Sequence, residues 1–240
     1  MPVSQKSIAA LTARQGNINT ALSAMGPGYS PSSSPIQLAT MQASHAQVLN
    51  INATLQPLED AIAAARTQLN LDINGLIEND GVDGLIKLMR NATGLMESLG
   101  VANESDAKRM RRLVNRADPK TKKKVAGQTP ANTKSTIESG IGSIIKYAED
   151  FIGIISSNPN YAPTDSTITV AAFNLLLPNI KNGAATIKTI GGQISAPVAE
   201  RRRIVSSKVN GFEKNISSVR KYVLGNFGRN SVEWNSIKNL

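Results

Sequence analysis

The sequence contains no cysteine, which excludes disulfide bonds, thiolate catalysis and cysteine-ligated metal sites. It holds a single histidine, His45, which has no second histidine or cysteine to act with. Aromatic residues make up only 4% of the chain, whereas hydrophobic residues make up 40%. A chain of 240 residues with this composition is long enough for a substantial core, and that core must be aliphatic.

Long apolar runs are absent as well. No segment approaches the roughly 18–20 consecutive apolar residues of a membrane span. The opening segment, MPVSQKSIAALTARQ, contains an apolar run too short for the core of a signal peptide. These absences predict a soluble, cytoplasmic protein.

Basic residues outnumber acidic residues only outside the first half of the chain. The net charge is +10, yet residues 1–114 carry equal numbers of basic and acidic side chains, nine of each. Residues 115–133 carry five basic and one acidic side chain, and residues 134–240 carry 13 and seven. The positive charge is therefore concentrated in the middle and in the second half.

One motif occurs twice, as YSPSSSPIQLATM at 29–41 and as YAPTDSTITVAAF at 161–173. Each copy follows about 20 residues in which one stripe of apolar side chains recurs every three or four positions, as in an amphipathic helix. A Gly-Pro-Gly or Asn-Pro-Asn segment that would end this helix lies between them. Each also opens a new stripe with the same spacing, which begins at Leu38 in one copy and at Val170 in the other. The motif therefore predicts an inter-helix loop that is closed by Tyr-x-Pro. Its Ser/Thr/Asp cluster is expected to cap the next helix.

This repetition predicts an all-α fold that is built from two tandem, related helical-hairpin or bundle repeats of about 110 residues. No convincing strand is found. The repeats are expected at 1–114 and 134–240, and the last helix of each repeat is expected to end at a glycine, Gly100 or Gly228. Residues 115–133, rich in Lys, Pro, Thr and Ala, are interpreted as an exposed basic linker.

Three features are expected to modify the helices. Pro57 and Pro197 are expected to kink or split the second helix of each repeat, and the sequence leaves open whether those helices continue. Gly191-Gly192 is interpreted as a helix interruption. The segment GIGSIIK at 140–146 lacks phosphate-loop spacing and is placed in mid-helix, where its small residues would let two helices approach.

The segments NPNYAPTDSTITVAAF, ERRRIVSSKV and SSVRKYVLGNFGRNSVEW resemble an uncharacterised bacterial family of helical proteins. Members carry a Y-x-P inter-helix loop, an Arg-rich helix and a K-Y-V-x-x-x-(F/Y)-G-x-x-S ending. The resemblance covers the second half well and the first half loosely, where Leu95–Ser105 departs from the ending. It implies a duplicated helical protein and carries no known activity.

No arrangement of catalytic, cofactor-binding or metal-binding residues is found, so a non-enzymatic protein without a cofactor is expected. His45 lies on the apolar stripe of its helix, where the other repeat has Leu177, and is interpreted as a structural side chain. Tyr222 and Trp234 are expected either to close the end of a bundle or to anchor a partner.

Charge is the main functional signal. Basic residues at 108–124 and 201–203 form two groups that could contact polyanions, or could equally be solvated surfaces. Neither group contains aromatic residues for base stacking, and no nucleic-acid-binding motif is found. The candidate residues are Lys108, Arg109, Arg111, Arg112, Arg116, Lys120, Lys122, Lys123, Lys124, Arg201, Arg202 and Arg203.

Two functions follow from these features. The first is a structural or protein-interaction helical bundle, which binds a protein partner or itself. The alternative is a non-specific nucleic-acid or polyanion-binding protein that uses the basic groups. The sequence does not identify the partner, the oligomeric state or the biological process.

Overall fold

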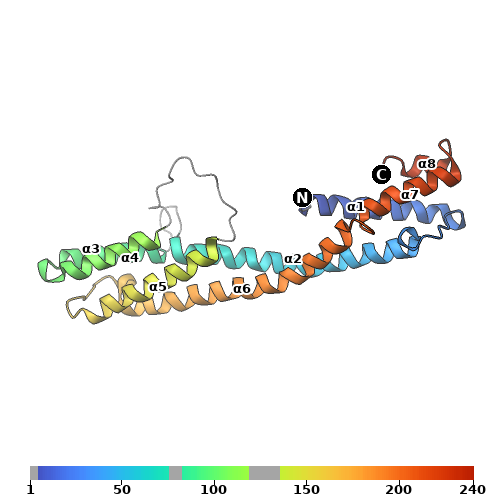
Figure 1. The fold of residues 1–240 in the computed structure, drawn as a ribbon. Helices are drawn as coiled ribbons and strands as arrows, with labels where there is room; N and C mark the ends of the chain where they lie inside the picture. Colours follow the sequence, from blue (N-terminus) through green and yellow to red (C-terminus); the bar gives the residue numbers. More distant parts are fainter. Residues whose placement is uncertain (1–4, 76–82, 119–135) are drawn as a thin grey trace, which may run out of the picture. The chain divides into compact units, whose positions relative to one another are not determined.

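A computed structural model describes residues 5–75, 83–118 and 136–240 of the chain (Figure 1). The protein is 84% helical, with eight α-helices and no strand among the residues described. The prediction of an all-α fold is confirmed. No described helix combines the length and apolarity that a membrane crossing needs. The sequence Asn79-Asp80-Gly81 also predicts a break between helices, and it lies outside the described residues.

Two of the helices, each of 37 residues, are much longer than the others. Within the described ranges, four short 3₁₀ turns lie in the connections, at Gly26–Gly28, Ser34–Ile36, Val101–Asn103 and Ser166–Ile168. The α-helices are α1 (Gln5–Met25), α2 (Leu38–Asn74), α3 (Leu85–Ser98), α4 (Glu104–Ala117), α5 (Thr136–Ser157), α6 (Val170–Ser206), α7 (Phe212–Phe227) and α8 (Val232–Ile237).

The stripes expected from the sequence are largely the buried faces of these helices. On α2 they include Met41 and Val48, and on α6 Phe173 and Ile180, all of which are buried. Burial of one face accounts for most of the stability of such helices in water. Gly100 lies two residues after the end of α3, and Gly228 directly follows α7. Both adopt a positive φ, +86° at Gly100 and +84° at Gly228. Glycine reaches this conformation without steric cost, so these two residues end the α3 and α7 segments as expected.

The predicted loop motifs are found at the starts of α2 and α6. In each loop the tyrosine is buried, and its hydroxyl donates to a backbone carbonyl seven residues later at 2.5 Å, Ile36 O for Tyr29 and Ile168 O for Tyr161. Side-chain capping occurs only in the second loop, where Thr169 Oγ1 accepts from the backbone N–H of Ala172. No side-chain cap forms at the 3₁₀ turn of the first loop.

The expected interruption at Gly191-Gly192 is wrong, because α6 runs without a break for 37 residues. The helices also continue through Pro57 and Pro197, so neither proline splits its helix. A proline removes only one backbone hydrogen bond, which buried residues on either side can outweigh. The segment 140–146 does lie within α5, but a Cβ at Gly140 or Gly142 would meet nothing within 4 Å. These glycines therefore make no close helix contact.

Residues 115–117, which were expected to begin the exposed basic linker, belong instead to a helix. Residues up to Ala117 form α4, and every third or fourth residue of this helix is buried: Ala107, Met110, Val114 and Ala117. The many charges between these positions hid the apolar stripe in the sequence. Of the predicted linker, residues 119–133 lie outside the described part of the chain. A further short helix, α8, follows Gly228.

The chain forms two compact units. One unit comprises Met1–Asp60 and Gly191–Leu240, and the other comprises Ala61–Ile190. The first unit contains α1, α7 and α8 with residues 38–60 of α2 and 191–206 of α6. The second contains α3, α4 and α5 with residues 61–74 of α2 and 170–190 of α6. Each unit therefore combines segments from both predicted repeats. In the second unit, α4 lies alongside α5 (Figure 1).

Candidate charged groove between α4 and α5

The candidate site lies on α4, a helix with one buried apolar face and one exposed charged face. Its buried face packs into the core of the second unit, so its charged residues are turned to the surface. Glu104 and Asp106 lie in the first turn and Arg116 in the last, the arrangement that the helix dipole favours. The exposed face carries Lys108, Arg109, Arg111, Arg112 and Arg116.

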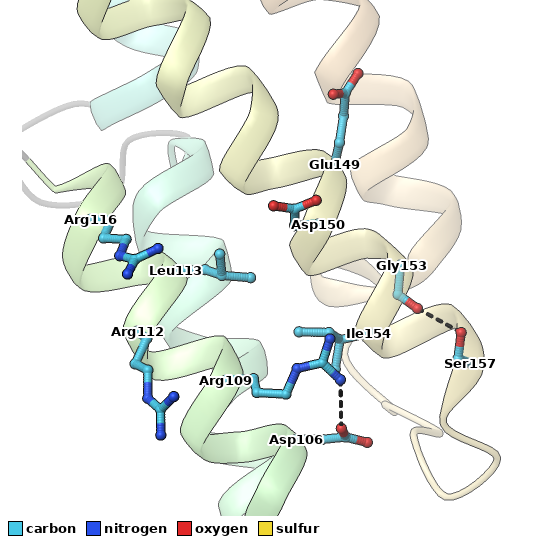
Figure 2. A pocket seen from close by; sticks show the side chains of 10 residues that line it. All are labelled: Asp106, Arg109, Arg112, Leu113, Arg116, Glu149, Asp150, Gly153, Ile154 and Ser157. Atoms are coloured by element: carbon cyan, nitrogen blue, oxygen red, sulfur yellow. Dashed lines mark hydrogen bonds and ion pairs between the residues drawn. The ribbon is translucent and has the colours of Figure 1, made fainter.

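An open groove of about 590 Å³ runs between this face and α5. Its apolar floor includes Leu113 of α4 and Ile154 of α5. Figure 2 shows Leu113 and Asp150 directed into the space between the helices from opposite sides. Gly153 has no side chain, which widens the groove on the side formed by α5. The remaining lining residues are Asp106, Arg109, Arg112, Arg116, Glu149 and Ser157.

Carboxylates neutralise much of the charge on α4. Lys108 Nζ lies 2.6 Å from Glu104 Oε1, and the hydrogen bond and charge of Lys108 lower the pKa of that carboxyl. Arg109 Nη1 lies 3.6 Å from Asp106 Oδ1 (Figure 2). Arg111 Nη2 reaches across to Glu97 Oε1 on α3, at 2.5 Å. These exposed pairs contribute little to stability, but each provides a cation of α4 with a carboxylate partner.

Three charged side chains that line the groove are not engaged in ion pairs of this kind. Arg112, Arg116 and Asp150 make no ion pair with any residue that the structure describes. Glu149, in contrast, is paired with Lys181 of α6 at 2.6 Å. The groove thus presents two unpaired cations and one unpaired anion beside an apolar floor.

A polar network fixes one end of the groove. Asn158, just after α5, donates from Nδ2 to Asn103 Oδ1 and to Asp106 Oδ2, both at 3.0 Å. Asn160 Nδ2 also donates to Asn103 Oδ1, at 3.3 Å. Asn103 is buried, so these bonds satisfy a polar group that would otherwise be costly. The start of α4 is therefore held against the end of α5.

The second predicted basic group lies on α6, in the first unit. Arg201 is only 7% exposed, and its Nη1 donates to Asn52 Oδ1 at 2.9 Å. Arg203 binds Glu200 through two hydrogen bonds of 2.7 Å, which lower the pKa of that carboxyl. Arg202 is exposed and has no ion pair among the described residues. Of these three arginines, only Arg202 is both exposed and unpaired.

The basic candidates on α4 therefore lie together in the second unit, and those on α6 lie together in the first. The candidates Lys120, Lys122, Lys123 and Lys124 lie outside the described residues. Sequence analysis missed the acidic partners. The pairs three or four residues apart, Glu104–Lys108, Asp106–Arg109 and Glu200–Arg203, could have been found from their spacing. The pair of Glu97 with Arg111 depends on how α3 packs on α4.

The first unit contains another cavity, of about 290 Å³, between α7, α8 and Arg14 of α1. Trp234 lines it. The side chain of Arg14 donates to the backbone oxygen of Leu240, and Arg220 Nε donates to Ile237 O at 3.3 Å. Burial, and secondly the charge of Arg14, lower the pKa of Arg220. Both arginines hold the end of the chain against α1 and α7.

The remaining aromatic candidates pack within the first unit. The rings of Tyr222 and Tyr29 meet edge to face, with centroids 5.4 Å apart. Tyr222 and Trp234 are partly buried against the core there, which favours the interpretation that they close the end of a bundle. His45 is half-buried, with its ring 6.4 Å from that of Phe212.

Across residues 5–75, 83–118 and 136–240, no group of three or more His, Asp or Glu side chains could hold a metal ion. The groove is lined mainly by carboxylates and guanidinium groups, and the hydroxyl of Ser157 donates to Gly153 O at 2.8 Å. Comparison of the chain with protein-family models, with curated proteins and with solved structures finds no match.

Proposed function

We propose that this is a non-enzymatic, cytoplasmic protein-interaction module that binds a protein partner in the groove between α4 and α5. The observation that carries this proposal is the combination of unpaired Arg112, Arg116 and Asp150 with the apolar floor of Leu113 and Ile154. A protein segment that presents carboxylates to the arginines and a basic residue to Asp150 matches this pattern.

The charge balance favours a protein over a nucleic acid as partner. The groove is lined by three arginines and three carboxylates, so its formal charge is zero. A phosphate backbone would meet Asp106, Glu149 and Asp150 as well as the arginines, and each carboxylate would repel it. A partner of mixed charge avoids this repulsion.

The proposal can be tested by site-specific photo-crosslinking of the full chain in cells that express it. A photoreactive amino acid at position 112 is expected to capture a protein in a discrete band, which mass spectrometry identifies. The same group at Lys188, exposed on α6, is the matched control. Arg116→Glu combined with Asp150→Lys should abolish capture at position 112 while the helical content stays unchanged. Equal capture at both positions, or none at 112, would contradict a partner in the groove.

The second candidate function is non-specific binding of polyanions. It is favoured by Arg112, Arg116 and Arg202, which are exposed and have no carboxylate partner among the described residues. Four further lysines at 120 and 122–124 add to the positive charge of the chain.

This second function predicts a steep salt dependence. With several cations on phosphates, affinity for duplex DNA should fall by a few orders of magnitude between about 50 and about 200 mM salt. Replacing Lys120, Lys122, Lys123 and Lys124 together by Gln should reduce the slope without unfolding the protein. Absence of DNA and RNA binding at low salt would exclude this function and leave the first.

We also propose that residues 1–114 and 134–240 are related repeats, as the family resemblance implies. The two tyrosine hydrogen bonds, the equal 37-residue lengths of α2 and α6, and the glycines with positive φ at 100 and 228 support this. Buried positions also match at a constant offset, such as Val48 with Ile180.

Two further glycines support the same relationship. Gly84 precedes α3 and Gly211 precedes α7, with nearly equal φ and ψ of −77° and 166° against −74° and 164°. A Cβ at Gly84 would lie 2.1 Å from the backbone of Gly75, and one at Gly211 would lie 2.4 Å from Ser207 O. Each glycine thus lets the chain pass closely against the end of the preceding long helix.

A further inference from the structure

We infer that residues 1–118 and residues 136–240 are complementary binding partners, each of which supplies part of the core of both compact units. The chain then needs no covalent connection between its halves to hold its fold. This inference goes beyond the proposed groove partner, because the partner here is the other half of this chain.

The core of the second unit is made by both halves. Residues 1–118 contribute Met89, Met96 and Met110, and residues 136–240 contribute Phe151 and Phe173 to the same cluster, all at most 1% exposed. Helix α4 packs along α5, and α3 packs on the 3₁₀ turn at Ser166–Ile168. Neither half alone could cover the apolar surfaces of these helices.

The core of the first unit has the same property. Ile18, Leu22 and Met41 of the first half are fully buried against Val219 and Val223 of the second half. A smaller cluster joins Ile8 and Val48 to Phe212 and its neighbours. Helix α1 contacts both α7 and α8. Separation of the halves would expose apolar surface in both units at once.

Polar contacts add specificity to this pairing. In the second unit Asn158 of the second half binds Asn103 and Asp106 of the first. In the first unit buried Arg201 donates to Asn52, and Gln47 donates to Glu200 at 3.2 Å. A partner other than the complementary half would leave buried polar groups unsatisfied, which disfavours it.

The test is cleavage of the folded full-length protein between its halves. A specific protease site is inserted between Gly127 and Gln128, and complete cutting is checked on a denaturing gel. The cut protein is expected to sediment as one species with the mass of the uncut chain and to keep its circular dichroism spectrum. Separation into two smaller species at micromolar concentration would overturn the inference.

Core variants identify what holds the cut halves together. Met110→Asp alters the core of the second unit and Val219→Asp that of the first, and the two changes combined should make the cut halves separate. Ser105→Asp and Ser217→Asp place the same charge on exposed positions of the same helices and should leave the complex intact. Separation of the control variants would also overturn the inference, because the cores would not be what joins the halves.

Discussion

At the scale of single residues, the two loop tyrosines illustrate how one side chain orders a connection. Each is buried and donates to a carbonyl at the start of the next helix. Burial, and secondly the charge of Asp165, raise the pKa of Tyr161 to about 12. The neutral hydroxyl is therefore the form that the folded state stabilises.

Tyr161→Phe removes this hydrogen bond and leaves the carbonyl of Ile168 unpaired. We expect the free energy of unfolding to fall by about 1–3 kcal/mol. The pH dependence has a definite sign. The folded pKa exceeds the unfolded value of about 10, so the stabilisation is complete below that pH and is lost as pH rises toward 12.

Urea unfolding at about pH 8 and about pH 11 checks both effects. The variant should lose less stability between these two pH values than the wild type does. An equal loss in both proteins would show that ionisation of Tyr161 makes no contribution.

A second residue-scale prediction concerns His45 and Gly16. A Cβ at Gly16 would lie 3.1 Å from the His45 ring, which is tighter than ordinary contact. At the positions 132 residues further along the chain are Ala148 and Leu177, both buried. The small residue at 16 therefore accommodates the imidazole.

We expect His45→Leu to be tolerated, and Gly16→Ala to be favourable only in that background. Alanine is better than glycine inside a helix by about 1 kcal/mol, a gain that the contact with His45 should offset. A double-mutant cycle in urea should give a coupling of at least about 0.5 kcal/mol. Additive effects would mean that the two side chains do not compete for space.

At the scale of elements, α4 shows how dense charge hides an amphipathic helix. Five basic residues surround its four buried positions, so the apolar spacing of this segment was not recognised in the sequence. The acidic first turn and the spacing of Ala107, Met110, Val114 and Ala117 are the signals that indicate the helix.

Met110→Ala should therefore destabilise the protein by about 2–5 kcal/mol, because the side chain is fully buried. Arg112→Ala, on the exposed face of the same helix, should change the free energy of unfolding by at most about 0.5 kcal/mol. Denaturant unfolding of both variants measures the difference. Similar small effects would mean that α4 does not bury Met110 in a core.

At the scale of the whole molecule, the length of the connection between α4 and α5 is expected to decide which halves can pair. Asn158 binds Asp106, and the groove joins the end of α4 to the middle of α5, so the helices run antiparallel. At 1.5 Å per residue, the start of α5 therefore lies about 16 Å beyond the end of α4 along the helix axes. Asp118 and two further residues would span at most about 14 Å, and the axes of two packed helices are separated by a further ~8–10 Å.

Replacement of residues 119–135 by Gly-Ser is expected to prevent pairing within one chain. Each half should then pair with the complementary half of a second copy, which at least doubles the molecular mass. Sedimentation measures this mass. A Gly/Ser segment of the original length is the control and should leave the mass as in the wild type. A shortened chain with unchanged mass and stability would contradict the expected exchange.

Much of the fold could be predicted from the sequence, because helix formation is encoded locally. The spacing of buried residues such as Met41 and Val48 predicted the helices, and Gly100 and Gly228 predicted where two of them end. Of the site, the sequence identified the basic residues on α4. It did not identify Asp150 or Glu97, because their positions relative to α4 depend on packing between helices.

The sequence by itself thus determined an all-α protein with an aliphatic core, two Tyr-x-Pro loops and unevenly placed positive charge. Only the tertiary structure decided that residues from both halves share each core, that Arg201 is buried, and that the cations of α4 face carboxylates. The physical reason is that periodicity specifies which face of a helix is buried. The partner of that face is chosen by contacts between residues far apart in the chain, which no local pattern contains.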